Sequence, residues 1–467
     1  IVSLAAALWI AGVRWVMPGF SVAGSLQTGL LDPLPLVYRS LNLVLLPLGE
    51  RFVAEHDLAP RFYSTVGFMG LWFALILLVG LVIPRAYCRF VCPLGALFGT
   101  LGRFYLLRIG KKRPGCKACN LCESQCQGAC APSAEIRSAE CVLCFNCWDS
   151  CRHGRMGYGS RPSASGEKPR PDVTRRSALI SLAAGVGLIS LERLQGRLAG
   201  NWHPGRIRPP GALREKDFLQ RCIKCGQCMR VCPTNVIHPA DLRFGWEAYW
   251  TPVLNFRLGL SGCQPNCVAC SQICPTAALR PLSLAERMGG GEFRRAGAVC
   301  IGTAFVDRGR CLPWAMDRPC IVCQEVCPVS PKAIFTRALN QPLPGAERLA
   351  VSGRNGPEVR LADFPLLPGA LGGGDFGCRL MGEVEDRTWK ILDNGAGSLT
   401  LMPGADGRLP EPGQTLQLEI HLQQPFVDPA RCIGCGICQH ECPVRGLPAI
   451  RVTAEGETRD PAHRMLA

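Results

Sequence analysis

The sequence contains no Cys-x-x-Cys-His segment, which excludes covalent attachment of a c-type haem. It has only seven histidines, none of them in a long apolar segment, so it offers no histidine ligands for a haem inside a membrane. We find no group of nucleophile, general base and orienting residue, and therefore expect no acid–base or nucleophilic catalysis. These absences leave the 29 cysteines as the residues that carry chemistry.

Disulfide bonds do not account for these cysteines. Their number is odd, so complete pairing within the chain is impossible. Cysteine makes up about 6% of the 467 residues, less than in a short disulfide-stabilised scaffold. The length and the apolar fraction of 48% allow about three packed domains and a few membrane spans.

The cysteines repeat a spacing that suits iron–sulfur clusters. Three thiols at two-residue intervals reach one [4Fe–4S] cube, and a fourth, often before proline, reaches a neighbouring cluster in two-cluster ferredoxins. Six motifs follow this pattern, the fourth and fifth with a wider first gap, and their number disfavours zinc. The predicted ligands, motif by motif, are Cys116, Cys119, Cys122 and Cys126; Cys141, Cys144, Cys147 and Cys151; Cys222, Cys225, Cys228 and Cys232; Cys263, Cys267, Cys270 and Cys274; Cys311, Cys320, Cys323 and Cys327; and Cys432, Cys435, Cys438 and Cys442.

The fourth ligand of the first motif has two candidates. The spacing favours Cys126, but no proline follows it, and Cys130 lies four residues further on. The sequence leaves this choice open.

The crossover of the fourth cysteine predicts how the motifs pair. We expect Cys151 to join Cys116, Cys119 and Cys122, and Cys126 to join the triplet of the second motif. Among the other four motifs we expect the third to pair with the sixth and the fourth with the fifth, because a long insert separates the fifth from the sixth. Three cations lie in or beside these motifs: Lys224, Arg230 and Arg431. They either raise the reduction potential of a nearby cluster or keep the protein soluble.

The N-terminal part is apolar and predicts membrane helices. Ile1–Val13 starts inside an apolar run without an initiator methionine, so we expect further sequence upstream. Gly24–Pro60 is interrupted by prolines and indicates an interfacial or re-entrant stretch. Phe62–Pro84 is uncharged and long enough to cross about 30 Å of hydrocarbon, and Val91–Gly102 is a shorter segment expected to pack against it.

Cys88 and Cys92 form a separate C-x3-C-P pair after that apolar segment. Their spacing is not that of a cluster loop. Two interpretations remain open: small thiols that pack inside the protein, or a redox pair that contacts a quinone headgroup at the membrane boundary. Cys300 and Cys378 are isolated in sequence and are interpreted as structural.

Two further segments divide the chain. Thr174–Leu179 contains paired arginines before an uncharged run that ends at Leu191, typical of a twin-arginine export signal, with a buried amphipathic helix as the alternative. The basic segment before it is expected in the cytoplasm and the residues after about 194 in the periplasm. Glu347–Gln424 holds no predicted ligand, and its Leu416, Leu418, Ile420 and Leu422 alternate with polar residues, which predicts a strand.

The predicted fold class is multi-domain, an α-helical membrane segment followed by α+β ferredoxin-like 4Fe-4S domains with a small β insert. The predicted domains are residues 1–109 (membrane, N-terminally incomplete), 110–156 (two-cluster ferredoxin), 157–195 (linker and export-signal-like segment), 196–346 with 425–467 (four-cluster ferredoxin) and 347–424 (β insert). The predicted location is the bacterial inner membrane, with residues 110–176 cytoplasmic.

Two known families share these motifs. Ala86–Leu97 (AYCRFVCPLGAL) and the two quartets after it resemble the NapH-type polyferredoxin membrane subunits of quinol dehydrogenases. Thr174–Gly185 and the last four motifs resemble the NapG/MauM ferredoxin-type proteins, so the chain is similar to a natural fusion of the two. A second C-x3-C-P motif, usual in the membrane family, is absent here.

The resemblance implies an electron-transfer subunit of a membrane-bound oxidoreductase. Electrons from quinol would pass through six [4Fe–4S] clusters to a periplasmic reductase or cytochrome c. The alternative is an iron–sulfur maturation or regulatory factor that supplies electrons for assembly of a partner metalloenzyme. Because six clusters of about −2 each offset most of the net charge of +16, no nucleic-acid partner is expected.

Overall fold

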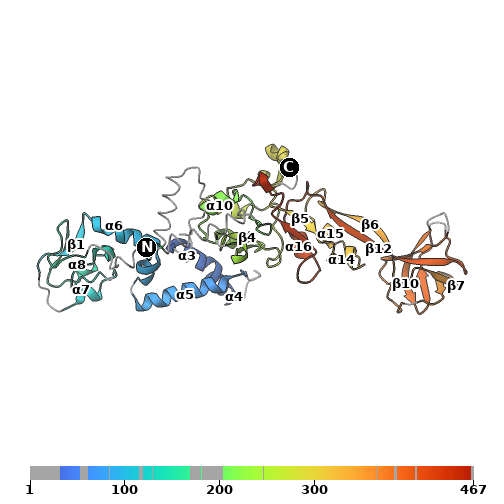
Figure 1. Cartoon of the computed structure of the whole chain (residues 1–467), viewed down its shortest axis with the longest axis horizontal. Helices are drawn as coiled ribbons and strands as arrows, with labels where there is room; N and C mark the ends of the chain where they lie inside the picture. Colours follow the sequence, from blue (N-terminus) through green and yellow to red (C-terminus); the bar gives the residue numbers. More distant parts are fainter. Residues whose placement is uncertain are drawn as a thin grey trace. The chain divides into compact units, whose positions relative to one another are not determined.

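A computed structural model describes residues 32–52, 61–83, 85–114, 119–128, 130–168, 180, 183, 203–245, 247–364, 366–382, 387–404 and 407–463 (Figure 1). The chain divides into two compact units. The first comprises Ile1–Gly259 and Cys267–Arg295, and the second comprises Leu260–Asn266 and Ala296–Ala467.

Among the described residues before 105, most are helical, and the longest of these helices is shorter than the sequence predicts. Helix α5 (Val66–Val82) begins after Thr65, whose backbone is left-handed (φ 63°), and ends at Ile83, which is extended because Pro84 follows. Its 17 residues rise about 26 Å, less than the roughly 30 Å of a hydrocarbon core. The other elements here are α3 (Pro33–Ser40), η1 (Leu41–Leu45), α4 (Leu46–Phe52), η2 (Tyr87–Val91), α6 (Pro93–Leu101) and η3 (Gly102–Phe104).

Nowhere in the described part of the chain is a helix both long and apolar enough to span a bilayer. The predicted α-helical membrane segment is therefore wrong, and so is the predicted placement in the inner membrane with residues 110–176 cytoplasmic and residues after about 194 periplasmic. Val91–Gly102 does contain a helix, α6, and its small residues pack on η4 (Ser138–Glu140). Ile1–Val13 lies outside the described residues, as does the run Ser177–Leu191 apart from Ile180 and Ala183.

The first two cysteine motifs lie between two paired strands. Strands β1 (Arg108–Lys111) and β2 (Met156–Gly159) are antiparallel, with Arg108 opposite Gly159. The chain between them forms η4 and two one-turn helices, α7 (Leu121–Ser124) and α8 (Asn146–Asp149). Two motif cysteines belong to the small core of this part, which consists of Ile109, Cys122, Ile136, Cys147 and Met156.

The remainder of the first unit carries the third motif and most of the fourth. A buried ion pair fixes the start of helix α10 (Glu215–Arg221), because Arg208 Nε donates to Glu215 Oε2 at 3.1 Å and Arg208 Nη1 to the carbonyl of Pro252 at 2.7 Å. Cys222 follows this helix directly. The other elements are α11 (Gln227–Arg230), β3 (Ile237–Pro239), η5 (Leu242–Phe244), β4 (Pro252–Leu254), α12 (Ala269–Gln272), α13 (Leu284–Met288) and η6 (Gly291–Arg295), with β3 and β4 antiparallel.

The second unit contains a seven-stranded antiparallel sheet in the order β6-β12-β7-β8-β11-β10-β9. Strand β12 (Thr415–Val427) also pairs with β9, so six of the strands form a closed ring. The alternating leucines of its first half face the core, which confirms the strand that the sequence predicts. The other strands are β6 (Ile334–Pro342), β7 (Leu349–Asn355), β8 (Glu358–Leu361), β9 (Phe376–Leu380), β10 (Thr388–Gly395) and β11 (Ser398–Leu401).

Strands β6 and β12 join this sheet to the cysteine motifs of the second unit. They pair from Ile334 opposite Val427 to Pro342 opposite Glu419, and Figure 1 shows them side by side. The first and the last residues of the segment that forms the sheet, Ile334 and Val427, therefore lie opposite each other. The rest of the second unit, which carries these motifs, contains four short helices and one pair of antiparallel strands. The helices are α14 (Leu312–Ala315), α15 (Val322–Glu325), α16 (Ile437–Glu441) and η7 (Pro461–His463), and the strands are β5 (Thr303–Val306) and β13 (Ile450–Thr453).

Candidate iron–sulfur sites

Each of the six motifs has a helix of one turn or slightly more that carries its third cysteine: α7, α8, α11, α12, α15 and α16. The loops before these helices repeatedly take the left-handed conformation. Among the described residues, left-handed ones precede the second cysteine of three motifs, at Leu143, Lys224 and Gly434. They follow it in four, at Asn120, Phe145, Gly226 and Gly436. Backbone that changes hand from residue to residue turns successive N–H groups toward one point, and such nests bind anions, iron–sulfur centres among them.

The nest geometry places N–H groups at the thiols. Burial is the largest effect on the pKa of Cys222 and raises it. The backbone N–H of Lys224 donates to the sulfur of Cys222 and lowers the pKa, which in sum is raised to about 11. The same relation, from a residue two positions later, holds between Ile437 and Cys435. N–H donors at cluster sulfurs stabilise the negative charge of a bound cluster.

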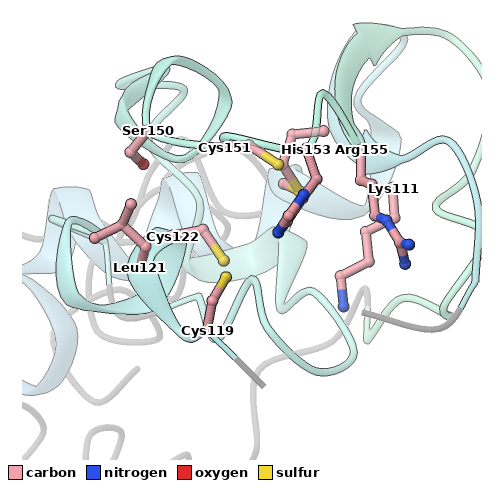
Figure 2. A pocket seen from close by; sticks show the side chains of 9 residues that line it. Lys111, Cys119, Leu121, Cys122, Ser150, Cys151, His153 and Arg155 are labelled. Carbon is pink, nitrogen blue, oxygen red and sulfur yellow. The ribbon is translucent and has the colours of Figure 1, made fainter. Parts of the chain in front are cut away.

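Cysteines of the first two motifs share one pocket, shown in Figure 2. Cys119, Cys122 and Cys151 line it, as the crossover predicts, while Cys116 lies outside the described residues. Burial favours a high pKa for Cys151, but the backbone N–H groups of Met156, Arg155 and His153 lower it below its usual value.

Two cationic side chains and a histidine border the same pocket. Lys111, His153 and Arg155 line it, and Lys111 is buried with its Nζ donating to the carbonyl of Ser133 at 2.6 Å. The positions of His153 and Arg155 directly after Cys151 are visible in the sequence, but that of Lys111 depends on the pairing of β1 with β2.

Five thiols gather at the neighbouring site, one more than a cluster requires. Cys126 and Cys130 lie 3.1 Å apart, and hydrogen bonds to Cys126 and Cys141 raise the pKa of Cys130. The hydrogen bond from Cys130 in turn lowers the pKa of Cys141 to about 7. Burial, followed by nearby thiolates, raises that of Cys147 to about 12. Both candidate fourth ligands therefore reach the second motif.

The third motif gathers with cysteines of the fourth. Buried Cys228 has a pKa well above its usual value because of burial and then the nearby thiolates of Cys222, Cys225, Cys270 and Cys274. Cys274 accepts the backbone N–H of Leu279 at 3.4 Å. The boundary between the two units falls between Asn266 and Cys267, inside the fourth motif.

The fifth and sixth motifs gather in the second unit. One pocket is lined by Cys311, Cys320, Cys323 and Cys442 together with apolar side chains. The thiolate of Cys327 acts on the sixth motif, where burial first and then neighbouring thiolates raise the pKa of Cys438.

These neighbours correct the predicted pairing of the last four motifs. The third motif lies with the fourth and the fifth with the sixth, not the third with the sixth and the fourth with the fifth. The length of the insert misled the prediction. Because β6 and β12 pair with each other, the two ends of the insert meet, and its length does not separate the motifs.

The donor set fits [4Fe–4S] clusters. Burial raises the pKa of Cys311 to about 11 and that of Cys323 to about 12. A buried thiol loses its proton readily only where a cation or a bound metal stabilises the thiolate. Among the described residues no three ligating groups are close enough to hold a single metal ion. A cube binds each thiolate to a different iron, so its four ligands stand further apart than those of one ion.

The C-x3-C-P pair has a clear structural role in one member. Cys92 is buried and is the N-cap of α6, where its sulfur accepts the N–H of Gly95 at 3.4 Å. Pro93 follows at the first helical position. The N–H group that proline lacks would form no hydrogen bond within the helix there. Cys88 is exposed. Of the two unassigned cysteines, Cys378 is buried in the sheet core, and Cys300 donates to the carbonyl of Cys432 at 3.3 Å.

Arg39, like Lys111, is a cation near a motif that the sequence does not indicate. Arg39 of α3 is 1% exposed and acts on the thiol of Cys225. The three cations that the sequence indicates adjoin the motifs along the chain, whereas Arg39 reaches the third motif through the packing of a distant helix.

Sequence comparisons agree with two of these sites, because the third and the sixth motif lie in matched ranges. Three families described as 4Fe-4S binding domains match residues 65–114, 218–238 and 423–444. An uncharacterised protein of Methanocaldococcus jannaschii is 32% identical over 87 residues, which are 19% of this chain and 35% of that protein. No solved structure matches.

Two relatives carry names. The ferredoxin-type protein NapG of Escherichia coli is 31% identical over 181 residues, 38% of this chain and 70% of NapG. The methylamine utilization ferredoxin-type protein MauM of Methylobacillus flagellatus is 30% identical over 192 residues, 39% of this chain and 73% of MauM. With such identity across more than two thirds of both relatives, the chain belongs to the NapG/MauM family of ferredoxin-type iron–sulfur proteins.

Proposed function

We propose that this electron-transfer protein relays single electrons through six [4Fe–4S] clusters, from quinol to a redox protein such as a periplasmic reductase or a cytochrome c. The observation that carries the proposal is the pocket in which Cys311, Cys320 and Cys323 of one motif meet Cys442 of another. That exchange of a fourth cysteine is the arrangement of two-cluster ferredoxins. The quinol donor and the acceptor rest on the resemblance to quinol dehydrogenase subunits.

The proposed ligand sets follow the crossover throughout. Cys232 is assigned to the fourth motif by the same rule, and either Cys126 or Cys130 completes the second. The sets are Cys116, Cys119, Cys122 and Cys151; Cys141, Cys144 and Cys147 with Cys126 or Cys130; Cys222, Cys225, Cys228 and Cys274; Cys263, Cys267, Cys270 and Cys232; Cys311, Cys320, Cys323 and Cys442; and Cys432, Cys435, Cys438 and Cys327.

Each cluster, when bound, takes up and releases one electron. The chain's own residues hold it and adjust its charge. Thiolates bind the irons, the N–H groups of the nests and of residues such as Leu279 donate to sulfur, and apolar side chains such as Val306 and Ile450 limit the access of water.

The function is tested by iron analysis and redox titration of the anaerobically purified protein. We expect about 24 irons per chain, four for each of six sites, and reduction by menadiol, a water-soluble quinol analogue. Reduction by dithionite but not by menadiol would contradict the quinol donor and favour the maturation factor. Clusters that neither reagent reduces would contradict electron transfer altogether.

We also propose that the exposed thiol of Cys88 contacts quinol during its oxidation. If the exposed Cys88 contacts quinol, Cys88→Ser slows reduction by menadiol and leaves reduction by dithionite unchanged. Cys92→Ser keeps an oxygen at the N-cap of α6 and removes the second thiol of the pair. Normal menadiol rates in both variants would leave the pair with a packing role alone.

The five-thiol site predicts redundancy between Cys126 and Cys130. Because both sulfurs reach the second motif, each single serine variant should retain the iron of that site, and Cys126→Ser/Cys130→Ser should lose about four irons. Iron analysis with EPR measures this. Loss of the cluster in only one single variant would instead identify that cysteine as the sole ligand.

A further inference from the structure

Arg39 is a buried cation in the first unit. It belongs to α3, its side chain is 1% exposed, and its guanidinium carbon lies 4.3 Å from the ring centre of Trp250. A guanidinium over an indole face is a favourable cation–π arrangement. The position of this charge is therefore fixed by packing and not by solvent.

The segment that carries Arg39 is packed on the loop of the third motif. Leu43, one turn after Arg39, is 1% exposed and covers Gly226, where an added Cβ would lie 3.1 Å from the leucine Cγ. Gly226 lies between Cys225 and Cys228 in the loop and has a left-handed backbone (φ 78°), which glycine adopts without strain. The N-terminal helices thus form one wall of this site.

Two more contacts fix the same wall. The hydroxyl of Tyr63 donates to the carbonyl of Met229 at 3.3 Å, and Arg230 Nη1 contacts Glu50 Oε2 at 3.1 Å. Both join residues more than 160 positions apart in the chain. Such long-range contacts join the segments after α3 to the third motif.

The charges of Arg39 and the third motif act on each other. Burial lowers the pKa of Arg39 to about 10, while Tyr87, Tyr249 and Cys225 raise it, so the side chain is cationic at neutral pH. A cation that packing holds beside the third motif favours negative charge there.

We propose that Arg39 is a positioning residue for electron transfer, a fixed buried cation that raises the reduction potential of the cluster held by Cys222, Cys225, Cys228 and Cys274. The proposal rests on the proposed function in that it requires a cluster at this site. Reduction adds one negative charge to a cluster that already carries about −2. A nearby cation favours that step, and a buried one is screened little by salt.

Lys224 in the motif loop is a second buried cation, and it acts on the thiol of Cys222. Two arginines near the site form ion pairs. Arg208 is paired with Glu215, and Arg230 with Glu50. Arg39 and Lys224 are therefore the buried cations to compare at this site.

The test is a mediated EPR redox titration of the intact holoprotein. Cys225→Ala identifies the signal of this cluster. Arg39→Met should shift its reduction equilibrium about tenfold toward the oxidised form, about 59 mV for a one-electron couple, and Arg39→Lys should restore most of the shift. Arg51→Met is the matched control, because it removes an exposed arginine from the neighbouring helix α4 and should shift no cluster.

The outcomes separate the proposal from a packing role. An unchanged potential in Arg39→Met, or an equal shift in Arg39→Lys, would overturn it. If Arg39→Met loses this cluster, retention in Arg39→Lys supports the need for the charge, and loss in both variants overturns it. Absence of any cluster signal in the unmodified protein would contradict the proposed function instead.

Discussion

Replacing Cys442 with serine is expected to remove the cluster of the fifth motif and to spare that of the sixth, to which Cys442 belongs in sequence. The reason is the pocket that Cys442 shares with Cys311, Cys320 and Cys323. Loss of a thiolate ligand at a buried site should remove about four irons per chain. Iron analysis and EPR measure the loss.

Matched variants show which cluster is lost. Cys442→Ser should reproduce the EPR spectrum of Cys320→Ser, and Cys327→Ser should reproduce that of Cys435→Ser. Cys378→Ser is the control, because this cysteine is buried in the sheet core and its variant should retain all iron. If Cys442→Ser matched Cys435→Ser, the crossover of these two motifs would be wrong.

Gly434→Ala is expected to cost about 4 kcal/mol or more of the free energy of unfolding and to release the cluster of the sixth motif. Gly434 lies between Cys432 and Cys435 with φ 71°, and an added Cβ would meet the carbonyl oxygen of Gly302 and lie 2.6 Å from its nitrogen. Both obstacles are backbone atoms, held by the bond from Ile301 N–H to the carbonyl of Ile433 at 3.1 Å. The loop cannot accommodate the methyl group without moving the ligands.

Gly446→Ala separates this clash from backbone strain. Gly446 has almost the same backbone angle (φ 72°), but an added Cβ meets no atom within 4 Å. Its alanine variant should lose about 1–2 kcal/mol, the cost of a left-handed non-glycine residue, and keep its iron. Denaturant unfolding followed by circular dichroism compares the two, and equal losses would show that strain alone is responsible.

The local parts of the sites could be predicted from the sequence because they depend on spacing. The triplets such as Cys222, Cys225 and Cys228 occupy one loop and one helical turn, and a two-residue interval fixes their approach. The crossover of Cys151 to the first motif also follows from a known arrangement. Both rest on short segments of chain, where local geometry decides the outcome.

The long-range parts could not be predicted. The partner of the sixth motif depends on the register of β6 with β12, which no spacing between cysteines reveals. The charge of Arg39 reaches Cys225 only because Leu43 packs on Gly226. The membrane prediction failed at Thr65, whose left-handed backbone shortens an apolar run that otherwise has the length of a span.

The shared pocket of the fifth and sixth motifs has a consequence for biosynthesis. Cys323 leaves the ribosome about 120 residues before Cys442, an interval of roughly 6–24 s at the usual rate of synthesis. With the proposed ligand set, the thiols of the fifth motif lack Cys442 throughout that time. On this proposal, the cluster is inserted only after the whole sheet has been translated, and the nascent thiols are exposed to oxidation until then.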